Sequence, residues 1–188
     1  MEPRVFRFGK IQILLHLHHL LLLGHLISSI ASIHHDTITT GTPYEDMYSS
    51  LAATPEDVAY FVKNGVLQLC QRGAAVKRAP QRWQDMPSEF IAKHDVVIAF
   101  EERIFDAVIE DLQLRQPTED FRPIHVICLD TKDNPHEAAR QGIVALRLCW
   151  MLEHAEDLDM EAAEIIDQFQ RERDSETSIK ILYQVCYL

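Results

Sequence analysis

Two short runs of apolar residues, separated by one amphipathic segment, place the tightest limits on the fold of this chain. The first run, residues 95–100, reads DVVIAF, and the second, residues 123–129, reads PIHVICL. Continuous β-branched apolar runs of this length are typical of strands buried on both faces of a parallel sheet. Between them, EERIFDAVIEDLQLR repeats apolar residues at helical spacing. The order strand–helix–strand therefore predicts an α/β fold with a parallel sheet and helices on its faces.

Further elements extend this pattern in both directions. TPED at residues 54–57 predicts a helix start, with Thr as the cap, Pro at the first helical position and acids in the first turn. This helix is expected to run toward Leu69. Two more helices are predicted over residues 134–154 and 162–173. The final segment, residues 178–188, is predicted to be the last strand.

Composition narrows the class of protein. A chain of 188 residues is long enough for one domain with a sizeable core. Its net charge of −11 argues against a general nucleic-acid surface, because phosphate contacts need clustered Lys and Arg. The four cysteines are widely spaced and form no CxxC pair. They therefore indicate reduced intracellular thiols rather than a disulfide framework or a zinc site.

Residues 1–40 differ from the rest of the chain. Residues 11–33 are rich in Leu and His and contain no acidic residue, and basic residues precede them, so a signal peptide or membrane anchor must be considered. Interior histidines and the lack of a convincing cleavage site argue against both. A metal site is not expected either, because no carboxylate or Cys lies near the histidine cluster. This cluster comprises His16, His18, His19 and His25. We predict that residues 1–40 lie outside a domain that spans residues 41–188.

The loop after the second run, in CLDTKDNPHEAARQGIV (residues 128–144), carries the candidate chemistry. Asn134 and Glu137 are explained as caps of the next helix, and His136 as a solvated first-turn residue. Asp130 is expected to hold the loop through backbone N–H groups. Asp133 is left without a structural role, at the carboxyl edge of a parallel sheet, where α/β proteins keep their sites. Its carboxylic acid could protonate a leaving alcohol while a nucleophile attacks phosphorus.

Several blocks resemble, in the right order and with similar spacing, the RNA polymerase II C-terminal-domain phosphatases of the suppressor-of-sua-seven type. The resemblance covers about residues 41–188 and rests on GTPYEDMY, NGVLQL, APQRWQ, DVVIAFEERIFDAVIEDL and PIHVICLDTKDNPHEA. It implies an elaborated low-molecular-weight-phosphatase fold: three α/β/α layers around a parallel sheet. It also implies removal of phosphate from serines of the polymerase tail, through a cysteinyl-phosphate intermediate and without metal or cofactor.

The resemblance also implies residue roles and partners. Asp133 matches the family's general acid, which would then act as a base on the hydrolytic water. Asp130 matches an aspartate that we interpret as structural, and residues 64–83 match a region that helps to shape the peptide groove. The implied partners are the phosphorylated polymerase tail and a symplekin-like scaffold of the cleavage and polyadenylation machinery. The implied location is the nucleus, with no direct contact to nucleic acid or membrane.

The nucleophilic cysteine of the family has no match in this sequence. The family begins with an apolar strand and a Cys-x5-Arg-Ser loop, in which the helix dipole and backbone N–H groups lower the thiol pKa. Six positions after Cys70, Cys128 and Cys149 stand Val76, Asn134 and Ala155, and Cys186 is too near the end of the sequence. The first strand and phosphate-binding loop are therefore missing or replaced.

Three interpretations of the chain follow. The first is a family member that is inactive, through a truncated or misjoined N-terminus or, less simply, as a divergent paralogue. The second is a non-catalytic binding module of the cleavage and polyadenylation machinery. The third, a protein anchored in a membrane by residues 11–33, fits the sequence least. In the first two, residues 11–23 could replace the lost strand as a makeshift strand or helix.

Overall fold

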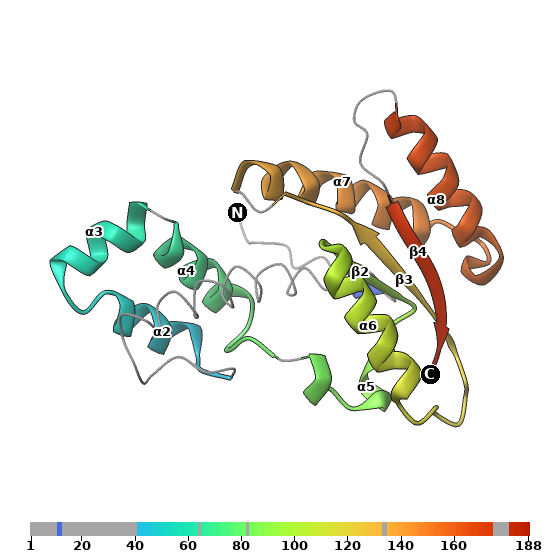
Figure 1. Cartoon of the computed structure of the whole chain (residues 1–188), viewed down its shortest axis with the longest axis horizontal. Helices are drawn as coiled ribbons and strands as arrows, with labels where there is room; N and C mark the ends of the chain where they lie inside the picture. Colours follow the sequence, from blue (N-terminus) through green and yellow to red (C-terminus); the bar gives the residue numbers. More distant parts are fainter. Residues whose placement is uncertain (1–10, 13–40, 64, 82, 133–134, 175–180) are drawn as a thin grey trace. The chain divides into compact units, whose positions relative to one another are not determined.

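The computed structural model describes residues 11–12, 41–63, 65–81, 83–132, 135–174 and 181–188 (Figure 1). Contacts along the chain divide it into two compact units. One unit holds the described residues from 41 to 85 and is helical. The other holds residues 11–12 and everything from residue 86 onward, and it contains the sheet.

Within the described residues, four strands form the sheet, in the order β1-β2-β3-β4. They are β1 (Ile11–Gln12), β2 (Val96–Ala99), β3 (Pro123–Leu129) and β4 (Ile181–Tyr187). The two apolar runs of the sequence are β2 and β3, and they pair in parallel, as predicted. The predicted parallel sheet is wrong for the last strand, because β4 runs antiparallel to β3.

The direction of β4 follows from the number of helices that precede it. Two helices, α7 (Pro135–Glu153) and α8 (Leu158–Asp174), connect β3 to β4 and pack against each other. One helix returns the chain to the amino end of the sheet, and a second brings it back to the carboxyl end. The chain therefore enters β4 beside the end of β3, with Ile181 opposite Leu129.

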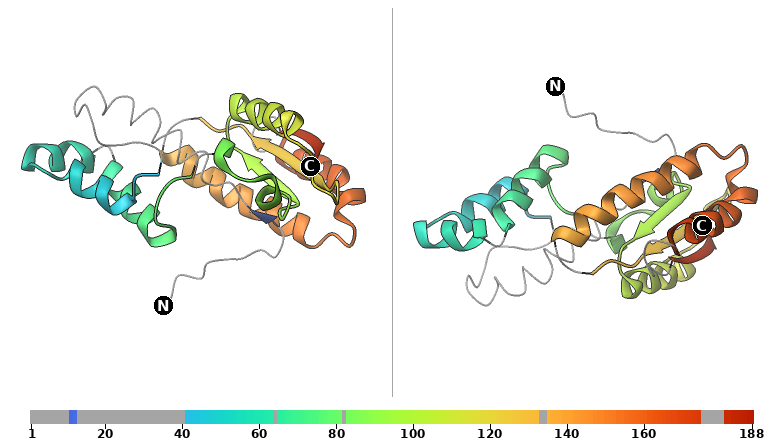
Figure 2. Two further views of the ribbon diagram at one scale, coloured as in Figure 1. Left: turned by 90° about the horizontal axis from the view of Figure 1, so that it is seen from below. Right: turned by 90° about the horizontal axis from the view of Figure 1, so that it is seen from above.

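Helices cover both faces of the sheet (Figure 2). Helix α6 (Glu102–Leu114) packs against β2, β3 and β4 on one face. Its buried side chains are Phe105, Val108 and Leu112, each worth roughly 1.5–3 kcal/mol of transfer free energy. On the other face, Ile98 and Ile127 join the core formed with α7 and α8. The sheet unit is thus a three-layer α/β/α structure, as predicted.

Among the described strands, β1 lies at one edge of the sheet. Ile11 pairs with Val96 and Gln12 with Val97, both in parallel. Two residues of the Leu/His-rich segment therefore form a strand beside β2, whereas residues 13–40 lie outside the described residues. The predicted boundary at residue 40 stays a prediction.

The helical unit contains α2 (Tyr44–Leu51), α3 (Pro55–Lys63) and α4 (Val66–Val76) around a core that includes Phe61 and Leu67. Two short helices follow, η1 (Trp83–Asp85) in this unit and α5 (Ser88–Ile91) in the sheet unit. Thr54 precedes α3 as predicted, and its Oγ1 accepts a hydrogen bond from the Asp57 N–H at 3.1 Å. The single helix expected from residue 55 to Leu69 is wrong. Gly65, with φ of 75°, separates α3 from α4.

Candidate active site

The loop that follows β3 is held to the ends of two parallel strands. Thr131 is buried, and its N–H donates to the carbonyl oxygen of Phe100, just after β2, at 2.9 Å. Its Oγ1 donates to the carbonyl oxygen of Leu129, the last residue of β3, at 2.6 Å. These two hydrogen bonds place the start of the loop at the carboxyl edge of the sheet, where sites form in α/β proteins.

Thr131, rather than Asp130, makes the described contacts at the start of this loop. The side chain of Asp130 is exposed, and its predicted role in holding the loop through backbone N–H groups stays a prediction. The signal for Thr131 was present in the sequence, because Ser and Thr hydroxyls often bond to nearby backbone groups where a strand ends. Choosing between neighbouring polar residues required the direction of each side chain, which depends on the strand register.

Helix α7 begins on the far side of the loop and is tied to the same strand end. Buried Gln141 directs its Nε2 toward the carbonyl oxygen of Leu129, at 3.4 Å. In the first turn, Glu137 pairs with Arg140 at 2.6 Å, and this hydrogen bond lowers the pKa of the Glu137 carboxyl. His136 has an 87% exposed side chain, which confirms that it is solvated.

Asp133 and Asn134 lie outside the described residues. Thr131 precedes them and Pro135 starts α7 after them. The assignment of Asp133 as general acid and of Asn134 as helix cap both stay predictions.

All four cysteines are buried, in positions that disfavour the thiolate. Burial raises the pKa of Cys70 to about 11 and that of Cys149 to about 12. Burial also raises the pKa of Cys186. A catalytic thiol needs the opposite environment, because the thiolate is the nucleophile and is stabilised by nearby cations or a helix N-terminus.

Cys128 lies next to the candidate loop, and its surroundings are ill suited to a nucleophile. Burial and then the negative charge of Asp130 raise its pKa to about 12, with further contributions from Glu102, Asp106 and Glu101. These carboxylates make the electrostatic potential at this thiol negative. A phosphate-binding loop needs a positive potential instead.

Metal-binding and membrane-spanning features are both missing from the described parts of the chain. Within them, no group of three or more His, Cys, Asp or Glu side chains could hold a metal ion. No helix there has both the length and the apolar character needed to cross a membrane. The cluster of His16, His18, His19 and His25 lies outside the described residues.

Part of the region expected to shape a peptide groove, residues 74–78, lines a cleft in the helical unit. This cleft of about 520 Å³ lies where the start of α2 meets the end of α4. Its lining residues are Pro43, Glu45, Asp46, Ala74, Ala75, Val76, Lys77 and Arg78. Burial lowers the pKa of Lys77 to about 8. Asn64 and Arg82 lie outside the described residues, and the role of this region in peptide binding stays a prediction.

The three-layer unit and the anchored loop after β3 together define an α/β protein with its candidate site at the carboxyl edge of the sheet. The family model described as "Ssu72-like protein" matches residues 32–188, so the chain belongs to this family. This confirms the resemblance seen in the sequence blocks. The matched region begins nine residues before Gly41, the start of the predicted domain.

Individual relatives agree with this assignment. The zebrafish (Danio rerio) RNA polymerase II C-terminal domain phosphatase SSU72 is 34% identical over 146 residues, which are 78% of this chain and 70% of the relative. The human protein of the same name is 32% identical over 146 residues, with the same coverage. By family, the chain is therefore a protein phosphatase.

A solved structure confirms the fold. The crystal structure of Drosophila melanogaster Ssu72 with Symplekin, bound to a cis peptidomimetic CTD phosphoserine peptide, aligns with a TM-score of 0.72. The two sequences are 28% identical, and the alignment covers 81% of this chain and 75% of the fly chain.

Proposed function

We propose that this chain is a catalytically silent member of the Ssu72-like family. The family role is removal of phosphate from phosphoserines in the heptad-repeat tail of RNA polymerase II, coupled to mRNA 3′-end processing and termination in the nucleus. That reaction passes through a cysteinyl-phosphate, with an aspartic acid that Asp133 matches. This chain retains the acid and lacks the nucleophile loop.

The observation that carries this proposal is the state of the four cysteines. None is followed by Arg at the sixth position, and Cys70, Cys128, Cys149 and Cys186 are all buried, with raised pKa values. The spacing of the sequence and the environment of the four thiols are independent observations. Both argue against a nucleophilic cysteine in this chain. Burial raises the pKa of Cys128 to about 12, so this thiol keeps its proton at neutral pH and is a poor nucleophile toward phosphorus.

The first experiment is a phosphatase assay on the purified 188-residue chain. The substrate is a phosphoserine heptad peptide, and the zebrafish relative serves as the active control. We expect no turnover above background. If the chain turns over peptide, and if Cys128→Ser or Cys70→Ser abolishes that turnover, the proposal is wrong and a different nucleophile is present.

A gain-of-function experiment tests the assignment of Asp133. A strand followed by Cys-x5-Arg-Ser, placed before Gly41, should create activity that falls about 10²–10⁴-fold in Asp133→Asn, the usual contribution of a general acid. Asp130→Asn is the matched control, since it removes an exposed carboxylate from the same loop. Full activity of the Asp133→Asn variant would rule out Asp133 as the acid.

A second candidate function is a non-catalytic binding module. It is favoured by the alignment of this chain with a fly protein that was crystallised with Symplekin. If the scaffold contact depends on the fold and not on the nucleophile, this chain should still form a complex with a symplekin-like protein. Size-exclusion chromatography of the chain with the fly Symplekin fragment tests this. Separate elution of the two proteins at micromolar concentration would contradict it.

A further inference from the structure

Away from the ends of the parallel strands, three polar side chains from three elements form a hydrogen-bonded series. His125 belongs to β3, and only 1% of its surface is exposed. Its Nδ1 lies 2.8 Å from the Oη of Tyr183 on β4. Its Nε2 lies 3.0 Å from the Oδ1 of Asp159 in the first turn of α8. Both nitrogens of a buried imidazole are therefore engaged.

The chemistry of the three groups sets the direction of these hydrogen bonds. An ionised carboxylate only accepts, so the Nε2–H of His125 donates to Asp159. The Nδ1 of a neutral imidazole is then an acceptor, and the Tyr183 O–H donates to it. This is the hydroxyl–imidazole–carboxylate order, in which the imidazole takes the proton of the hydroxyl and the carboxylate stabilises the resulting imidazolium.

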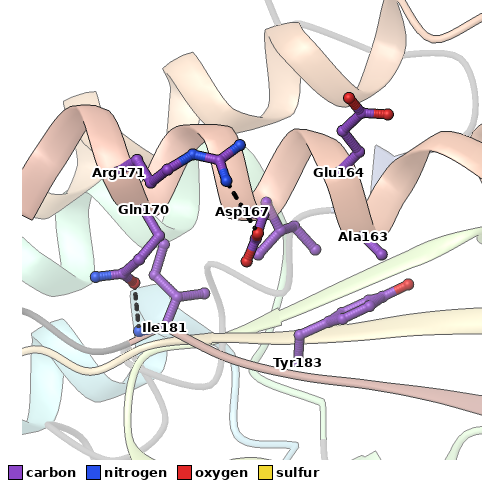
Figure 3. A pocket seen from close by; sticks show the side chains of 8 residues that line it. Ala163, Glu164, Asp167, Gln170, Arg171, Ile181 and Tyr183 are labelled. Atoms are coloured by element: carbon purple, nitrogen blue, oxygen red, sulfur yellow. Dashed lines mark hydrogen bonds and ion pairs between the residues drawn. The ribbon is translucent and has the colours of Figure 1, made fainter.

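Tyr183, at one end of this series, borders a cleft. Tyr183 lines a cleft of about 670 Å³ between α8 and β4, and its side chain is partly exposed. In Figure 3 the hydroxyl of Tyr183 points away from the ion pair between Asp167 and Arg171. In this pair, the Arg171 Nη1 lies 3.3 Å from the Asp167 Oδ2. At the other end of the series, the Asp159 side chain is 60% exposed. A small molecule can thus approach the Tyr183 ring, whereas the base behind it is shielded from water.

We propose that Tyr183 is a nucleophilic hydroxyl, activated by His125 and Asp159, that accepts acyl groups from activated esters. Its Oη bonds to the carbonyl carbon of the ester while its proton passes to Nδ1 of His125. The bond from the carbonyl carbon to the leaving oxygen then breaks, and the imidazolium returns the proton to the leaving alcohol. The products are an O-acyl tyrosine and a free alcohol, and no oxidant or reductant takes part.

Burial, and next the negative charge of Asp159, raise the pKa of Tyr183. Its hydroxyl therefore keeps its proton at neutral pH, and proton transfer to His125 must accompany attack, as general-base catalysis requires. None of the three residues lies in the loop after β3. This reactivity is consequently independent of the phosphatase function discussed above.

The test uses the full chain and p-nitrophenyl acetate near neutral pH. We expect a burst of p-nitrophenolate approaching one equivalent, with the acetyl group found on Tyr183 by peptide mass spectrometry. Tyr183→Phe should remove the burst. Asp159→Asn changes an exposed side chain and keeps an acceptor oxygen, so it should fold, and we expect it to slow the burst by about tenfold or more. Tyr187→Phe is the matched control, since Tyr187 lies on the same strand, is 53% exposed and stacks on Phe121 instead of bonding to a histidine.

Three outcomes would overturn the proposal. They are acetylation spread evenly over exposed tyrosines and lysines, a burst that survives Tyr183→Phe, and a burst rate unchanged in Asp159→Asn. Thermal melts of each variant show whether the fold is retained. A phosphopeptide assay separates this reactivity from phosphatase activity. It uses the chain with the Cys-x5-Arg-Ser segment placed before Gly41, and we expect Tyr183→Phe to leave the phosphatase activity of that chain unchanged.

Discussion

Single residues in this chain take their roles from the face of the strand on which they fall. Cys128 stands two positions before Asp130 in the sequence and looks like a candidate nucleophile for the same loop. Side chains alternate along a strand, so Cys128 falls on the opposite face from Ile127 and Leu129, which pack against α7 and α8. The thiol of Cys128 therefore faces the side of the sheet that α6 covers, where it is buried.

The raised pKa of Cys128 predicts lower stability at alkaline pH. This pKa rises from an ordinary 9.0 to about 12 in the folded protein, so between these values the folded state keeps a proton that the unfolded chain releases. The contribution of the protonated thiol to stability is therefore complete below about pH 9 and is lost as the pH rises toward about 12. We expect the urea midpoint to fall as the pH rises through this window, and to fall less steeply in Cys128→Ala.

Thiol labelling gives an independent check on the same residues. At mildly alkaline pH, Ellman's reagent should label native protein much more slowly than protein unfolded in urea, because the thiols are both buried and protonated. Labelling of the native protein at the rate of a free thiol would contradict the buried, protonated environment of these thiols. In the denaturation experiment, a urea midpoint that falls with pH equally steeply in Cys128→Ala and in the unsubstituted chain would contradict the raised pKa of Cys128.

Whole elements were predictable where one local pattern was strong. The two apolar runs, the helix between them and the cap at Thr54 lie where periodicity and capping placed them. The break at Gly65 was missed, because the apolar spacing continues across it. The signal that could have found it is the Asn-Gly pair at residues 64–65, a common turn sequence.

Two glycine substitutions should change stability in opposite directions. Gly65 has a φ of 75°, where a Cβ is strained, so we expect Gly65→Ala to destabilise by about 1–2 kcal/mol. Gly142 lies inside α7, and a Cβ built there meets no atom within 4 Å. We therefore expect Gly142→Ala to stabilise by roughly 0.5–1 kcal/mol. Urea denaturation of both variants measures the two effects, and effects of the same sign would refute the conformational argument.

At the scale of the whole molecule, the N-terminal segment supplies an edge strand to a sheet that otherwise begins at β2. The His125 N–H donates to the Asp95 carbonyl oxygen at 2.8 Å, and N–H and C=O groups alternate sides along a parallel strand. Val97 and Ala99 therefore point their backbone groups toward β3. Val96 and Ile98 point theirs toward β1.

This alternation predicts the effect of deleting residues 1–12. Amide hydrogen exchange at Val96 and Ile98 should accelerate by about tenfold or more, because a lost edge strand leaves these groups open to water. Exchange at Val97 and Ala99 should change little, since their partners on β3 remain. These two amides are the internal control. Equal acceleration at all four amides would indicate global loss of stability and contradict the local pairing, and unchanged exchange would contradict β1 itself.

The sequence by itself determined the local features of this protein: two buried strands, the helix between them, the helix start at Thr54, the family blocks, and the lack of a Cys-x5-Arg spacing. Each depends on residues a few positions apart. Tertiary structure alone decided that β4 is antiparallel, that Thr131 ties the start of the loop to the strand ends, and that His125 meets Tyr183 and Asp159. The physical reason is that strand direction and side-chain contact are settled by packing between distant segments, whose free energy is not encoded in any one local pattern.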